Sequence, residues 1–183
     1  LGAPFAAEYF DVMPDMIVCA KGLTNGVIPM GAVLTTAEIH DAFMTGPEHM
    51  IELFHGYTYT GHPMAAAAAL ATLDVYREEQ LFENVLKLED RWADAAMSLK
   101  GHPLVEDIRT LGLVAAIDMK SVEGQPGLRA YKAMENGFHD HDIVLRITGD
   151  TIALSPPLMI NEAQIDEIFS EKIPAVLESV AKL

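Results

Sequence analysis

The chain has 183 residues and carries 12 Lys and Arg against 27 Asp and Glu, which gives a formal net charge of −15. This charge argues against a nucleic-acid partner, because phosphate binding needs clustered Lys and Arg. The longest apolar stretch, Met64–Leu73, is shorter than the roughly 20 residues that a bilayer-spanning helix requires, so we expect no membrane partner. The single cysteine, Cys19, excludes an internal disulfide and favours a cytoplasmic location.

The residue pattern predicts an α/β protein. Short apolar, β-branched runs indicate strands, and apolar residues at spacings of three and four indicate amphipathic helices. In chain order we predict a strand at 16–19, a strand at 31–34, a helix from 35 through 44, helices at 63–79 and 81–99, strands at 105–111 and 113–118, a helix at 128–136, strands at 143–147 and 151–154, and a helix opening at 161. The helical region between residues 75 and 100 should contain a domain boundary.

Two helix starts carry a capping-box pattern. Thr35 with Glu38 predicts one box, and Asn161 with Gln164 predicts the other. Within the last helix, Pro174 should kink or interrupt the chain, because proline lacks a backbone N–H.

Lys21 follows directly after the first predicted strand, where α/β sheets place their ligand sites. A desolvated lysine without a carboxylate partner is a nucleophilic amine, suited to Schiff-base formation with a carbonyl substrate or with pyridoxal phosphate (PLP). The alternative is a strand-end lysine that points to solvent, and spacing alone favours that alternative.

The segment His55–Pro63 combines hydroxyl groups, glycines and the start of an alanine-rich helix. Helix N-termini bind anions through their free N–H groups, and Thr58 or Thr60 can add a hydrogen bond. The segment alone nevertheless favours a plain loop with a helix cap.

Arg146 lies in an otherwise apolar predicted strand. A guanidinium in such a place pairs with a carboxylate, either a structural one such as Asp150 or that of a substrate. Chemistry alone favours the structural pair. The seven histidines show no zinc-ligand spacing, so we predict no metal site.

Several segments together resemble one enzyme family. They are Ile17-Val18-Cys19-Ala20-Lys21-Gly22-Leu23, Pro29-Met30-Gly31-Ala32, His55-Gly56-Tyr57-Thr58-Tyr59 with Gly61-His62-Pro63, Arg146 with Gly149-Asp150, and Ser155-Pro156-Pro157-Leu158. In this order they resemble class III aminotransferases, which are PLP enzymes of fold type I. The resemblance is greatest to the ω-amino acid–pyruvate (β-alanine–pyruvate) aminotransferases.

The resemblance implies a role for each of three residues. Lys21 matches the lysine that holds PLP as an internal aldimine and then moves a proton between substrate and cofactor. Thr58 matches the threonine that binds the cofactor phosphate across a dimer interface. Arg146 is similar to the mobile arginine that binds the carboxylate of a keto acid. Thr60 stands where the family more often has Gly or Ser.

The implied reaction is a ping-pong transamination from an ω-amino acid or amine to pyruvate. The chain begins at Leu1 and lacks the phosphate loop, the stacking aromatic residue and the aspartate that family members carry earlier in their sequence. We therefore expect a carboxyl-terminal half, inactive alone, that needs an amino-terminal half and forms a homodimer or tetramer. Residues 1–75 would end the large PLP-binding domain, and residues 76–183 would form the small α/β domain.

Two alternatives remain open from the sequence. One is another class III aminotransferase or an aminomutase with a different donor. The other is a non-catalytic α/β interaction module in which Lys21 is only a surface residue.

Overall fold

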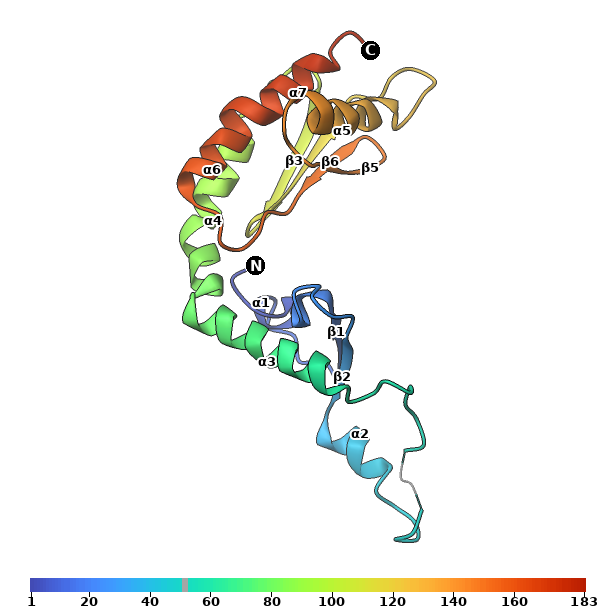
Figure 1. Ribbon diagram of the computed structural model, residues 1–183. Helices are drawn as coiled ribbons and strands as arrows, with labels where there is room; N and C mark the ends of the chain where they lie inside the picture. The colour runs from blue at the N-terminus through green and yellow to red at the C-terminus, as the bar shows by residue number, and fades with distance from the viewer. Residues whose placement is uncertain (51–52) are drawn as a thin grey trace. The chain divides into compact units, whose positions relative to one another are not determined.

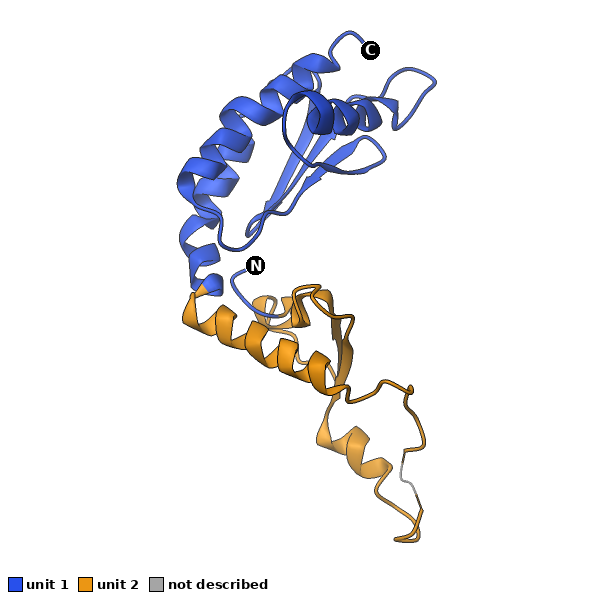
Figure 2. Ribbon diagram, in the orientation of Figure 1, with its two compact units in different colours: residues 1–4, 81–183 blue, residues 5–80 orange. Residues whose placement is uncertain are grey.

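The computed structural model describes residues 1–50 and 53–183 (Figure 1). It contains two compact units, one of residues 5–80 and one of residues 81–183 together with residues 1–4 (Figure 2). We call them the 5–80 unit and the 81–183 unit. The predicted domains, 1–75 and 76–183, concern the domains of a longer enzyme and stay a prediction. Within the described residues, no helix has the length and apolar character needed to cross a membrane.

The 5–80 unit is built on an antiparallel strand pair. Its elements are helix α1 (Ala6–Tyr9), strand β1 (Met16–Ala20), the single 3₁₀ turn η1 (Lys21–Leu23), strand β2 (Gly31–Thr35), helix α2 (Ala37–Ala42) and helix α3 (Pro63–Glu78). The register sets Met16 opposite Thr35 and Ala20 opposite Gly31. The carboxyl end of β1 therefore leads straight into the turn that contains Lys21.

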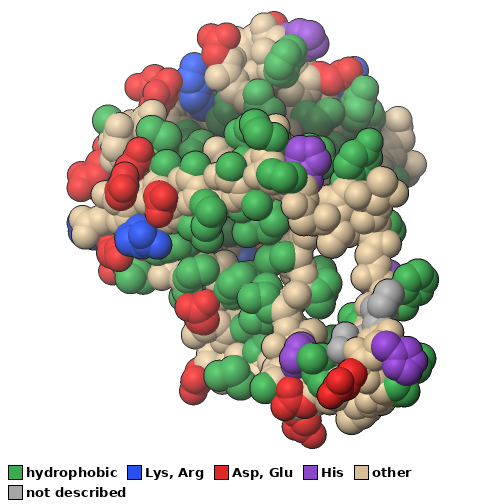
Figure 3. Space-filling model, turned by 60° about the horizontal axis from the view of Figure 1, so that its bottom comes forward, with side chains coloured by type: hydrophobic (Ala, Val, Ile, Leu, Met, Phe, Trp, Pro, Cys, Tyr) green, Lys and Arg blue, Asp and Glu red, His purple; other side chains and the backbone are tan. Residues whose placement is uncertain are grey.

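The strand pair exposes much apolar surface. Val18 is 78% exposed and Val33 is 62% exposed, and Met16 and Leu34 are also largely uncovered. Figure 3 shows how widely hydrophobic side chains reach the surface of the face it presents. Strands this apolar are typical of a sheet that is covered on both faces, and an isolated strand pair is only marginally stable in water.

The 81–183 unit has a sheet of order β3-β4-β6-β5, antiparallel throughout. Its elements are α4 (Leu81–Met97), β3 (Val105–Leu111), β4 (Val114–Met119), α5 (Leu128–Asp140), β5 (Arg146–Thr148), β6 (Thr151–Leu154), α6 (Glu162–Glu167), the π-helical turn η2 (Ile168–Lys172) and α7 (Ile173–Ser179). Helices pack on the sheet to enclose the main core (Figure 1). At its centre, the rings of Trp92 and Phe169 meet edge to face, with centroids 4.9 Å apart.

The start of α2 differs from the prediction. Thr35 does not cap a helix, because it is the last residue of β2 and pairs with Met16. Thr36 takes the N-cap position instead, with no side-chain capping hydrogen bond, and the helix covers only Ala37–Ala42. A strand pairing that is remote in sequence has overridden the local pattern.

The predictions for the last helix are confirmed. The Asn161 N–H donates to Gln164 Oε1 at 3.1 Å, and the Gln164 N–H donates to Asn161 Oδ1 at 3.0 Å. The helix is interrupted by the π-helical turn Ile168–Lys172, which ends two residues before Pro174. A wider turn relieves the clash between a proline ring and the carbonyl one turn earlier.

Candidate functional site

Lys21 is the first residue after β1 and lies exposed at the strand's carboxyl end. Its backbone φ is +54°, in the left-handed region, which is uncommon for residues other than Gly, Asn and Asp. Its carbonyl accepts hydrogen bonds from the N–H groups of Thr24 at 3.2 Å and Gly26 at 3.3 Å. Among the described residues, none makes a hydrogen bond or ion pair with the Lys21 amine, so the nitrogen is available to a ligand.

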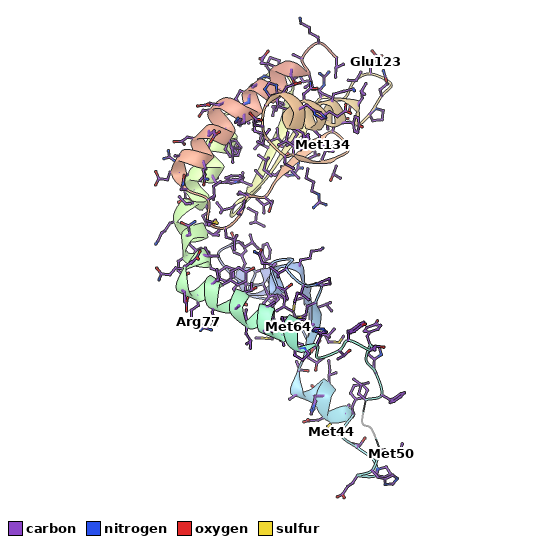
Figure 4. All side chains as sticks on the ribbon, viewed as in Figure 1. Met44, Met50, Met64, Arg77, Glu123 and Met134 are labelled. Carbon is purple, nitrogen blue, oxygen red and sulfur yellow. The ribbon has the colours of Figure 1, made fainter. Side chains whose placement is uncertain are left out.

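Side chains hold the turn from within and from α3. Thr24 is 1% exposed, and its hydroxyl donates to the carbonyl of Ile28 at 2.6 Å. From α3, the hydroxyl of Tyr76 donates to the carbonyl of Gly22 at 2.8 Å. Figure 4 labels Met64 near the start of α3 and Arg77, the neighbour of Tyr76, near its end. The sequence analysis missed Thr24 and Tyr76, since neither belongs to a recognisable motif.

The loop before α3 is a tight turn that presents Thr58. The Tyr57 N–H donates to the Thr60 hydroxyl at 2.8 Å, and the Thr60 N–H donates to the Tyr57 carbonyl at 2.9 Å. Thr60 thus closes the turn, whereas the exposed Thr58 hydroxyl makes no hydrogen bond to any described residue. His62 caps α3, because its Nδ1 accepts from the Met64 N–H at 3.2 Å.

Arg146 opens β5, an edge strand of its sheet, and its side chain is exposed. The structural pair with Asp150 does not form. The Asp150 carboxylate instead accepts from the Ser121 hydroxyl at 2.6 Å, the Gly127 N–H at 2.7 Å and the Ala130 N–H at 3.5 Å. Burial acts to raise the pKa of Asp150, but these hydrogen bonds outweigh it and lower that pKa below its ordinary value.

Every other arginine has a partner within the chain. The pairs are Arg77 with Asp74, Arg91 with Asp166 and Glu162, Arg109 with Asp107 and Asp118, and the buried Arg129 with the carbonyls of Lys120 and Val180. Among the described residues, Arg146 alone of the arginines lacks such a partner. A free guanidinium on an exposed strand edge can bind a carboxylate through two parallel hydrogen bonds, as a bidentate pair.

The predicted site residues fall in different units. Lys21 and Thr58 belong to the 5–80 unit, where no contact between their side chains is found, and Arg146 belongs to the 81–183 unit. A pocket of about 440 Å³ in the 81–183 unit is lined by Ile143, Pro156 and Pro157, among others. None of the predicted site residues lines it. In the described part of the chain, no group of three or more His, Cys, Asp or Glu side chains could hold a metal ion.

Comparison with known proteins gives consistent matches. The aminotransferase class-III family model matches residues 1–177. The omega-aminotransferase of Caulobacter vibrioides is 51% identical over 180 residues, which are 98% of this chain and 40% of that protein. The beta-alanine–pyruvate aminotransferase of Pseudomonas aeruginosa is 38% identical over 175 residues, which are 92% of this chain and 38% of that protein.

A solved structure has the same fold. It is an amine transaminase from an uncultivated Pseudomonas species in the PLP-bound, internal aldimine form, with a TM-score of 0.82 and 33% identity. The match covers 98% of this chain and 40% of that one. The chain thus spans about two fifths of the length of the curated relatives that it matches.

Proposed function

Since the chain belongs to the class III aminotransferase family and has the fold of PLP-dependent transaminases of fold type I, we propose that the protein carrying it transfers an amino group from an ω-amino acid or amine to pyruvate. The observation that carries the proposal is the exposed, unpaired Lys21 amine at the end of β1. Two relatives, an omega-aminotransferase and a beta-alanine–pyruvate aminotransferase, support the choice of an ω-amine donor and of pyruvate.

The residues present fit PLP, the cofactor of this family. Covalent attachment needs an amine without a competing carboxylate, and Lys21 has no such partner among the described residues. Phosphate binding needs a hydroxyl that is free to donate, and the hydroxyl of Thr58, in the loop before α3, makes no hydrogen bond to any described residue. When bound, PLP supplies the electron sink that makes the C–H bond on the amine-bearing carbon of the substrate breakable. In the family pattern the ring contacts come from residues that precede this segment, so we propose that an amino-terminal half completes the site.

Lys21 would act at two moments. Its Nζ would hold the cofactor covalently in the resting enzyme, and once released by the substrate amine it would serve as the base and acid that moves a proton at the substrate carbon. The backbone hydrogen bonds of Thr24 and Gly26 to the Lys21 carbonyl anchor the chain from which this amine extends.

Thr58 would bind the phosphate. Thr60 closes the turn by accepting the Tyr57 N–H at 2.8 Å, so the neighbouring Thr58 hydroxyl is left to donate to an anion. Following the family pattern, we propose that this contact is made across a subunit interface, which requires a homodimer or a tetramer. The exposed apolar faces of β1 and β2 supply surface for such assembly. The cytoplasmic location stays a prediction.

Arg146 would orient the keto acid. Its guanidinium has no partner among the described residues, and a two-pronged hydrogen-bonded pair with the pyruvate carboxylate would align the keto carbon for reaction. Because a simple amine lacks a carboxylate, Arg146 should matter for the acceptor and little for such a donor. This contrast separates the proposed activity from that of an enzyme with a different substrate pair.

The test uses the full-length protein that carries this chain. We expect a yellow protein in which borohydride fixes a pyridoxyl group onto Lys21, found by peptide mass mapping, and a Lys21→Ala variant that takes up no covalent label. A colourless wild-type protein, or a label on another lysine, would contradict the proposal and favour a non-catalytic interaction module.

A further inference from the structure

One hydrogen bond joins the turn of Lys21 to a helix far along the chain. The Tyr76 hydroxyl donates to the Gly22 carbonyl at 2.8 Å, across a separation of 54 residues. Helix α3 also contacts the turn through backbone proximity. The residue directly after the lysine is therefore fixed by a side chain outside its own loop.

The absence of a side chain at Gly22 lets the Tyr76 hydroxyl come close to its backbone. A Cβ built on Gly22 would lie 3.3 Å from the Tyr76 hydroxyl oxygen, which is tighter than ordinary van der Waals contact. Gly22 is not among the glycines with positive φ, so its backbone conformation is open to other residues. The close approach of Tyr76, and not the backbone, is what favours glycine here.

The Lys21 backbone needs such support. Its φ of +54° is a conformation that non-glycine residues adopt at some energetic cost. The bonds from Thr24 and Gly26 to the Lys21 carbonyl are local and form within the turn itself. The Tyr76 bond differs because it connects the turn to α3, a sixteen-residue helix.

We propose that Tyr76 is a positioning residue for Lys21. By holding the turn after β1, Tyr76 fixes the direction in which the Lys21 side chain extends. This inference rests on the proposed role of Lys21 as the PLP-binding residue. Tyr76 would act through the backbone of Gly22, whose carbonyl its hydroxyl binds.

The experiment compares Tyr76→Phe with the wild type in the full-length protein freed of cofactor. Rates of covalent PLP capture on Lys21 are measured by borohydride quenching and peptide mass mapping. Affinity for pyridoxamine phosphate, which has no aldehyde and cannot bond to lysine, reports non-covalent binding alone. We expect capture to slow about 3- to 10-fold, the value of one hydrogen bond, with unchanged affinity for pyridoxamine phosphate. Tyr131→Phe, an exposed tyrosine of the other unit, is the matched control and should change neither.

A second variant tests the contact itself. Gly22→Ala should also slow capture, because its Cβ meets the Tyr76 oxygen, and adding Tyr76→Phe should cost less than it does alone because that oxygen is gone. Capture in Tyr76→Phe within twofold of wild type, an equal loss of pyridoxamine phosphate affinity, or strict additivity of the two substitutions would each overturn the positioning role. If wild-type Lys21 captures no PLP, the proposed function itself fails, which is a distinct result.

Discussion

Replacing Asp150 by Asn measures how strongly one carboxylate ties the turn between β5 and β6 to the start of α5. The carboxylate accepts two short hydrogen bonds, from Ser121 at 2.6 Å and from the Gly127 N–H at 2.7 Å, and a longer one from Ala130 at 3.5 Å. Asparagine keeps the shape but has a single acceptor oxygen and no charge. Both short bonds end on the same oxygen, Oδ2, so an asparagine oxygen in that place would keep them only as weaker, neutral bonds, while its NH₂ group would replace the oxygen that accepts from the Ala130 N–H. The attraction between an anion and a helix start is lost as well.

The magnitude follows from those contacts. A hydrogen bond to a charged group contributes about 1.5–3 kcal/mol and a neutral one about 0.5–1.5 kcal/mol, so weakening the two short bonds costs about 1 kcal/mol each. The helix-start term adds about 0.3–1 kcal/mol. Asp150 is only half-buried, so solvent screening reduces the sum, and we expect a loss of about 2 kcal/mol. Since RT is about 0.6 kcal/mol, the Gly127 amide should exchange with solvent deuterium about 30-fold faster.

The assay is amide hydrogen exchange resolved at Gly127, with Asp140→Asn as the control. Asp140 is an exposed carboxylate at the other end of α5, so its replacement removes the same charge without touching the turn. A change at Gly127 smaller than about 3-fold in Asp150→Asn would refute the reasoning, as it would equal less than about 0.7 kcal/mol.

The effect also has a defined pH dependence. Because the folded-state pKa of Asp150 is lowered, its contribution is present above the unfolded-state value near 3.9 and disappears as the pH falls through the folded-state pKa. The stability that wild type has over Asp150→Asn, measured by exchange at Gly127, should therefore be greatest near pH 7 and decrease below about pH 4. A difference that grows on acidification would mean that the sign of the pKa shift is wrong.

Two further predictions follow from the arginine and the capping box. Arg146→Ala should raise the KM for pyruvate about 10- to 100-fold, the loss of a charge-assisted pair, and barely change the KM for a simple amine. Steady-state kinetics with each substrate varied would show this, and equal effects on both would remove Arg146 from the carboxylate site. Asn161→Ala should destabilise the last helix by about 1 kcal/mol, seen as a lower Tm, whereas replacing the exposed Glu171 by Ala should change the Tm little.

Periodicity predicted most of the helices and strands because their pattern is local, but it missed α1 and placed a strand at 143–147 where β5 covers only Arg146–Thr148. Helix α4, Leu81–Met97, was expected at 81–99, since a single apolar stripe defines it. The box of Asn161 and Gln164 is equally local. Thr35 shows the limit of local patterns. It has a capping-box sequence like that of Asn161, but its backbone pairs with Met16, a strand residue nineteen positions earlier.

The sequence predicted the residues that could carry the chemistry of the site, but not the residues that hold them in place. Lys21 and Arg146 stand out in the sequence because Lys21 directly follows an apolar strand and Arg146 is a charged residue in an otherwise apolar one. Asp150, four residues from Arg146, was a reasonable partner in sequence, yet the tertiary fold turns it to Gly127 and Ser121. Tyr76 gave no signal, because only the fold brings it to a turn 54 residues away.

The π-helical turn at Ile168–Lys172 bears on how this protein can change length during evolution. A π turn holds one residue more than an α turn, so Ile165 before it and Ile173 after it both stay buried. Loss of one residue inside the turn would restore an ordinary α-helix without rotating either half. The same loss inside α7 would turn every later side chain by about 100° and expose Val180. Single-residue gaps among relatives should therefore gather at 168–172 and avoid the helices on either side.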